Sequence, residues 1–124
     1  MIKFKLIEKG NPGKPTEPKK WHALAIYSDK VTQKELSANL ADLSSLSMGD
    51  VANVITNLVQ ELPKILSRGG IVQLGELGSF RITLSSTWAA TKQKFSTETI
   101  KPKITFTPWI ELKKALDTLK YQQE

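Results

Sequence analysis

The first thirty residues alternate between apolar and polar positions in the way that is typical of β-strands. Every second position from Ile2 to Leu6 is apolar, with lysines between, which predicts a half-buried strand. A stretch rich in glycine and proline over residues 10–18 predicts a loop. Residues 21–27 form a second apolar run, so the sequence predicts a small antiparallel pair of strands.

The next segment, residues 32–68, has the three-and-four apolar spacing of helices. Thr32 and Glu35 have the spacing of a capping box, and Ser47 offers a second N-cap before a longer helix. Pro63 falls inside that helix and is expected to kink it, because proline removes a backbone donor. The longer helix carries a wide apolar stripe, made of Val51, Val54, Ile55, Leu58, Val59, Leu62, Ile65 and Leu66.

That apolar stripe is wider than one short neighbouring helix can cover. We therefore favour a dimer surface over a purely internal core as its partner. A dimer would also suit a chain of 124 residues, because association adds buried area that a small single chain lacks.

Two alternating strands dominate the third segment. Residues 71–74 predict a short strand and residues 75–78 a turn. The apolar positions of the two strands that follow are expected to face the core, and these are Phe80, Ile82, Leu84, Ile104 and Phe106. The opposite face then carries Arg81, Thr83, Lys103 and Thr105. Pro108 opens a short terminal helix whose apolar side comprises Trp109, Leu112, Leu116 and Leu119.

Positive charge is concentrated in two parts of the chain. The net charge is +6, with +4 in residues 1–30 and +4 in residues 80–108. Residues 31–79 carry −2 and residues 109–124 are neutral. Such patches suit a polyanion, and nucleic acid is the commonest polyanion in a cytoplasm. Charge alone does not separate this interpretation from a solvated basic surface that maintains solubility.

No motif for catalysis or for a cofactor is present. His22 is the only histidine and lies in an apolar strand, which favours a structural role, and there is no cysteine. Asp50 and Glu76 are isolated carboxylates, interpreted as cap and turn residues. We therefore expect a protein that is not an enzyme, with no cofactor, no metal and no small-molecule substrate.

Two features of the chain bear on its location. No segment approaches the roughly 18 apolar residues of a membrane span, and the first residues lack the apolar run of a signal peptide. We expect a cytoplasmic protein that does not bind membranes.

Two stretches of the sequence carry the motifs of a known family. Residues 70–80 are similar to a strand that runs into a Gly-Phe-Gly-Thr-Phe turn, in which Gly78 and Phe80 match while residues 76–77 depart. Residues 106–113 are similar to a closing phenylalanine, a turn and a Leu-Lys helix. Together with the order of the predicted elements, these motifs resemble the bacterial histone-like HU/IHF family.

The resemblance covers about residues 31–121 and implies an α+β fold with a helical base, a β-saddle and an extended β-arm at about residues 85–100. It implies a homodimer whose arms embrace the minor groove of double-stranded DNA without sequence specificity, as an architectural protein of the nucleoid. Residues 31–124 would form this DNA-binding domain. Its candidate DNA-binding residues are Arg81, Thr83, Lys92, Lys94, Lys101, Lys103, Thr105 and Lys113.

The arm departs from the family, because it lacks the Arg-Asn-Pro motif whose proline enters the DNA stack. Trp88 or Phe95 could replace that proline as an intercalating wedge, since architectural proteins also use other apolar side chains. Either aromatic could instead pack the loop against the body, and we favour packing. Ile110 stands where many relatives carry a lysine, whereas Lys113 matches the terminal-helix lysine of the family.

Residues 1–30 lie outside the ordinary family and resemble the N-terminal β-strand extension of a divergent HU-like branch. Three roles stay open for them: capping the sheet, covering the dimer edge, or extending the basic surface. An alternative function also stays open, that of an HU-like protein-interaction or scaffold module that has lost DNA binding. In that alternative the N-terminal strands recruit a partner, and the basic residues do not converge on one surface.

Overall fold

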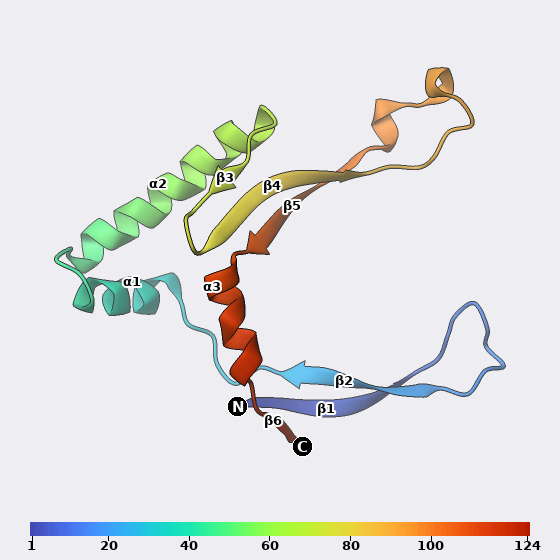
Figure 1. Ribbon diagram of the computed structural model, residues 1–124, viewed down its shortest axis with the longest axis horizontal. Helices are drawn as coiled ribbons and strands as arrows, with labels where there is room; N and C mark the ends of the chain where they lie inside the picture. Colours follow the sequence, from blue (N-terminus) through green and yellow to red (C-terminus); the bar gives the residue numbers. More distant parts are fainter.

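Two β-hairpins and a pair of helices form the chain, and the computed structural model describes all of residues 1–124. The two long helices lie on one side, and both hairpins project to the other side from opposite ends of a short helix (Figure 1). This α+β architecture agrees with the predicted fold class. The helices and strands are β1 (Ile2–Lys9), β2 (Lys20–Ile26), α1 (Gln33–Asp42), α2 (Met48–Ser67), β3 (Val72–Gln73), β4 (Gly78–Ser85), β5 (Lys101–Pro108), α3 (Ile110–Lys113) and β6 (Tyr121–Gln123). Three short 3-10 helices complete them, namely η1 (Lys92–Lys94), η2 (Thr97–Thr99) and η3 (Lys114–Thr118).

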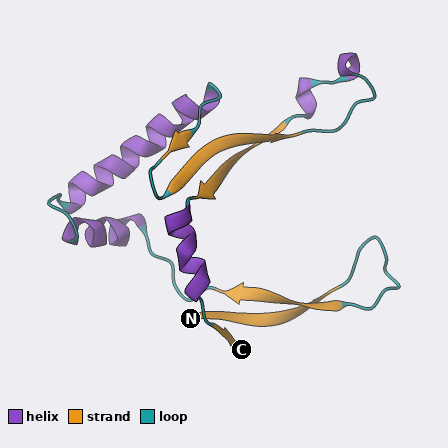
Figure 2. Cartoon of the chain, in the orientation of Figure 1, coloured by secondary structure: helices purple, strands orange, loops and turns teal.

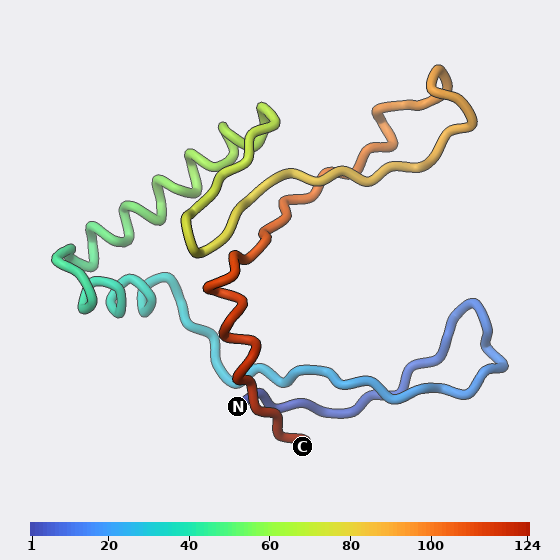
Figure 3. The backbone as a smooth tube through the Cα atoms, in the orientation of Figure 1, coloured from blue at the N-terminus to red at the C-terminus, as the bar shows by residue number.

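The first sheet has the order β2-β1-β6 and joins the two ends of the chain, as the tube in Figure 3 shows. β1 and β2 are antiparallel, which confirms the predicted strand pair. β6 runs parallel to β1, with Ile2 opposite Tyr121, and the N–H of Ile2 donates to the carbonyl oxygen of Lys120 at 2.8 Å. The sequence does not predict β6, because its three mostly polar residues show no alternation. The predicted domain boundary at residue 30 stays a prediction. The C-terminal strand β6 belongs to the same sheet as the two N-terminal strands.

Both long helices begin where the sequence predicts. Thr32 is the N-cap of α1, and its Oγ1 accepts a hydrogen bond from the N–H of Glu35 at 3.3 Å. Before α2, Ser47 and Asp50 form a reciprocal capping box, with bonds of 3.1 Å and 3.2 Å. α2 continues through Pro63 to Ser67 as one helix. The helix is not interrupted at Pro63, and the predicted kink stays a prediction.

The second sheet has the order β3-β4-β5 and contains the second hairpin. β4 and β5 are antiparallel from Gly78 opposite Pro108 to Ser85 opposite Lys101. The terminal helix is shorter than predicted, because α3 covers four residues and continues only as 3-10 turns to Thr118. The backbone N–H of Trp109 donates to the carbonyl oxygen of Leu77 at 3.2 Å and ties the start of α3 to the β3–β4 turn.

Very little of the chain is buried. Only five of the 124 residues are buried, and Val51 and Leu66 are the only large apolar ones. The apolar residues of β4 and β5 share one face, as predicted, and the rings of Phe80 and Phe106 lie 5.0 Å apart. This apolar face is not part of a core within the single chain, because Ile104 is 62% exposed.

Candidate nucleic-acid interface

The strand register collects most of the predicted binding residues on one face of the second hairpin. Residues directly opposite in an antiparallel pair point to the same side of the sheet, as do alternate residues along each strand. Arg81 lies opposite Thr105, and Thr83 opposite Lys103. Oγ1 of Thr83 and Oγ1 of Thr105 are 2.7 Å apart, which fits this shared side. We call this surface the polar sheet face, and it comprises Arg81, Thr83, Ser85, Lys101, Lys103 and Thr105.

The two lysines of the polar sheet face are free to bind an anion. Lys101 and Lys103 are exposed, and neither forms an ion pair. The hydroxyl groups between them can donate to phosphate oxygens. Lysine, arginine and threonine side chains on one exposed strand face match the groups that proteins use to contact the phosphates of DNA.

Arg81 lies at the root of this face and is half-buried. Its Nη2 donates to Oγ of Ser79 at 3.4 Å, while its buried Nε has no partner. A hollow of about 270 Å³ surrounds it, lined by Ile71, Gln73, Ser79, Arg81 and Trp109. A buried donor without an acceptor costs about 1–3 kcal/mol, so the position of this guanidinium is strained rather than relaxed in the single chain.

The predicted arm contains no β-strand beyond the pair of Ser85 with Lys101. Residues 86–100 form a loop with the two short helices η1 and η2 at the far end of the hairpin (Figure 2). Lys92 and Lys94 lie in η1 and are exposed. Trp88 is 88% exposed in the single chain, whereas Phe95 is 40% exposed. The structure leaves the choice between wedge and packing untested.

One predicted residue lies apart from the others. Lys113 is the last residue of α3 and is exposed, but no strand register or hydrogen bond links its side chain to the polar sheet face. Its predicted contact with phosphate stays a prediction. Ile110, where the family often has lysine, is 63% exposed.

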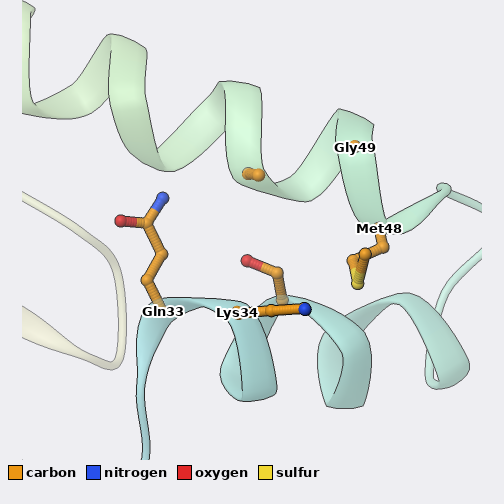
Figure 4. A pocket seen from close by; sticks show the side chains of 6 residues that line it. Gln33, Lys34, Met48 and Gly49 are labelled. Atoms are coloured by element: carbon orange, nitrogen blue, oxygen red, sulfur yellow. The ribbon is translucent and has the colours of Figure 1, made fainter.

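Another hollow lies elsewhere, between α1 and α2. Its volume is about 360 Å³, and it is lined by Gln33, Lys34, Ser37, Met48, Gly49 and Ala52 (Figure 4). Lys34 is the only charged residue in this lining, and the buried hydroxyl of Ser37 has no partner. The lining contains no acid–base pair of the kind that hydrolytic or transfer chemistry uses. No group of three or more histidine, aspartate or glutamate residues could hold a metal ion, and no helix is long and apolar enough to span a membrane.

Comparison with solved structures identifies a similar fold. A chain described as a "putative bacterial DNA binding protein" from Bacteroides vulgatus superimposes with a TM-score of 0.66 and 12% sequence identity. The match covers 98% of this chain and 47% of that one, so this chain spans about half the length of its structural neighbour. At such low identity the likeness concerns the fold alone. No curated protein matches the sequence.

Comparison with family models gives the assignment. The model described as an HU domain fused to wHTH, Ig, or a glycine-rich motif matches residues 1–123. The match includes the N-terminal hairpin as well as the part that resembles HU. The chain therefore belongs to this HU-HIG family, and it carries an HU-like domain.

Proposed function

We propose that the chain binds double-stranded DNA without sequence specificity, through the polar sheet face and the residues of the arm. The observation that carries the proposal is the register of β4 and β5, which brings Arg81, Lys103 and the two threonines to one side. Phosphates would be neutralised by the cations and bonded by the hydroxyls, neither of which reads base identity. The DNA-binding name of the structural neighbour and the HU-like family are consistent with this role.

The proposal includes a homodimer. The apolar face of β4 and β5 and the stripe on α2 both remain exposed in the single chain, with Ile104 at 62% and Val59 at 67%. Large exposed apolar surfaces on a protein often mark an interface with a partner. A second copy would cover these surfaces and leave the polar sheet faces and arms of both subunits for DNA, as an architectural, nucleoid-associated protein needs. The role requires no catalytic step and no cofactor.

The alternative is a protein-interaction or scaffold module that has lost DNA binding. The missing Arg-Asn-Pro motif and the apolar N-terminal strands favour it. It expects the basic residues to be dispersed, whereas the register brings Arg81, Lys101 and Lys103 to one side of the hairpin. Salt separates the two functions, because phosphate contacts weaken steeply as salt rises and apolar contacts do not.

Binding to a random-sequence duplex is expected to depend strongly on salt. Each phosphate contact contributes about −0.9 to the slope of log affinity against log salt concentration. Replacing Arg81 or Lys103 with alanine should therefore make the slope less negative by about 0.9 for each subunit that makes the contact. Fluorescence anisotropy of a labelled duplex at several salt concentrations measures this. The absence of binding at low salt would reject the DNA-binding function.

DNA bending is proposed as a separate step, with Trp88 as the wedge. Removal of an aromatic that stacks on a base costs about 1–3 kcal/mol of binding free energy. Trp88→Ala should therefore weaken binding by about 5- to 150-fold, and it should abolish the rise in energy transfer between dyes at the two duplex ends. Trp88→Phe is the control that keeps an aromatic ring. If Trp88→Ala binds and bends DNA as the unmodified protein does, Trp88 is not a wedge.

A further inference from the structure

We infer that the N-terminal hairpin carries a second phosphate-binding surface, which contacts duplex DNA independently of the polar sheet face. The register of β1 and β2 places Lys5 opposite Leu24, Ile7 opposite His22, and Lys9 opposite Lys20. Alternate residues share a side, so one face of the hairpin collects the basic residues. We call this surface the hairpin lysine face, and it comprises Lys3, Lys5, Lys9, Lys20 and His22.

No carboxylate of either strand compensates this charge from the same side. Glu8 is the only acidic residue of β1 and β2, and it points to the opposite face with Trp21. Lys3 is paired with Glu124 at 3.7 Å, whereas Lys5 and the two lysines near the tip have no ion-pair partner. All five side chains are exposed. The apolar residues between them can support the lysine stems and keep the ammonium groups in solvent.

The outer end of the hairpin lysine face is hollowed. A polar pocket of about 260 Å³ lies at the tip, lined by Lys9, Gly10, Asn11, Glu17, Pro18, Lys20 and His22. None of these residues is a large apolar one. Lys9 and Lys20 stand directly opposite each other there, and an ammonium, an amide and an imidazole can each donate a hydrogen bond to a phosphate oxygen. Glu17 is already paired with Lys14 at 3.5 Å.

The length of the surface favours a duplex over a small anion. Lys5 and Lys9 are four residues apart, about 13 Å along a strand at 3.3 Å per residue. Over that length B-DNA presents about eight phosphate charges, at one per 1.7 Å. Both hairpins project to the same side of α3 (Figure 1). The chain therefore carries two separate basic surfaces on extensions that point the same way.

This inference goes beyond the proposed function, because the polar sheet face could bind DNA alone. The test compares three charge-neutralising variants of the full chain on a labelled random-sequence duplex. One replaces Lys5, Lys9 and Lys20 with glutamine; a second replaces Lys101 and Lys103. The control replaces Lys30, Lys34 and Lys64, which removes the same charge as the first variant from outside both surfaces.

We expect the hairpin variant to reduce the salt slope by about 0.9 for each lysine that contacts a phosphate, while the control leaves it unchanged. The corresponding Lys→Arg variant should retain the slope, because arginine keeps the positive charge at each position. If the hairpin variant binds DNA as the control does, the inference is overturned, whatever the Lys101 and Lys103 variant does. The hairpin variant is also titrated with polyglutamate, which stands in for an acidic protein partner. If it loses binding to polyglutamate but keeps its binding to DNA, the inference is overturned in favour of such a partner.

Discussion

Gly78→Ala is expected to destabilise the protein by about 3 kcal/mol, from backbone strain of about 1–3 kcal/mol and a steric term of similar size. Gly78 has φ 147°, which L side chains rarely adopt. A Cβ there would also collide with the carbonyl oxygen of Thr107 and approach the ring of Phe106 to 2.8 Å. Thr107 and Phe106 both belong to β5. The clash could be removed only if β4 and β5 separated at the pair of Gly78 with Pro108. Urea denaturation at fixed protein concentration measures the free energy of unfolding.

Two other glycines separate the causes. Gly75 has φ 53° with nothing within 4 Å of a built Cβ, so Gly75→Ala should show the backbone cost alone, about 1–2 kcal/mol. Gly49 lies in the first turn of α2 with only Oγ of Ser47 near, at 3.8 Å, and Gly49→Ala should not destabilise the protein. A Gly78→Ala variant no less stable than Gly75→Ala would show that β5 does not confine this position.

The local elements follow from local sequence signals. Thr32 and Ser47 cap their helices because their hydroxyls satisfy donors that the first turn leaves unpaired. The alternation of residues 80–85 and 103–107 places the apolar and polar residues on opposite faces, and the structure has this arrangement. In these segments the spacing of apolar residues and the cap or turn at the end are together compatible with only one type of secondary structure.

Tertiary features were harder to predict. β6 exists because its backbone pairs with β1, more than 110 residues away in sequence, as in the pair of Ile2 with Tyr121. No side-chain pattern in Tyr121–Gln123 encodes that pairing. The hairpin lysine face was missed for a related reason: the charge of residues 1–30 was evident, but which lysines share a side depends on the register between β1 and β2.

The candidate site was predicted in part. Alternation alone indicates that Arg81 and Thr83 share a side, and that Lys103 and Thr105 do so, whereas their pairing across the hairpin depends on register. The partial burial of Arg81 and its unpartnered Nε were not predictable, because they depend on tertiary neighbours such as Ser79 and Trp109. The arm could not be placed, since residues 86–100 have neither alternation nor helical spacing.

The apolar surfaces of the single chain link its stability to association. Leu40, Leu43, Leu46, Val51 and Val54 line an apolar hollow of about 300 Å³. Val54 is nevertheless 59% exposed. In a protein that functions as a monomer, substitution of such a residue changes stability by no more than about 0.5 kcal/mol. In a dimer that covers the hollow, the same position is buried.

Val54→Glu is therefore expected to abolish the dimer. A carboxylate buried without a partner costs several kcal/mol, and each 1.4 kcal/mol raises the dissociation constant tenfold. The variant should sediment as a monomer at micromolar concentration and melt well below the unmodified protein, whose melting temperature should rise with concentration. Gln60→Glu adds the same charge to the same helix, at an exposed polar position, and should leave the dimer intact. If the unmodified chain sediments as a monomer and Val54→Glu melts with it, the exposed apolar surfaces serve a different partner, and the homodimer in the proposed function is wrong.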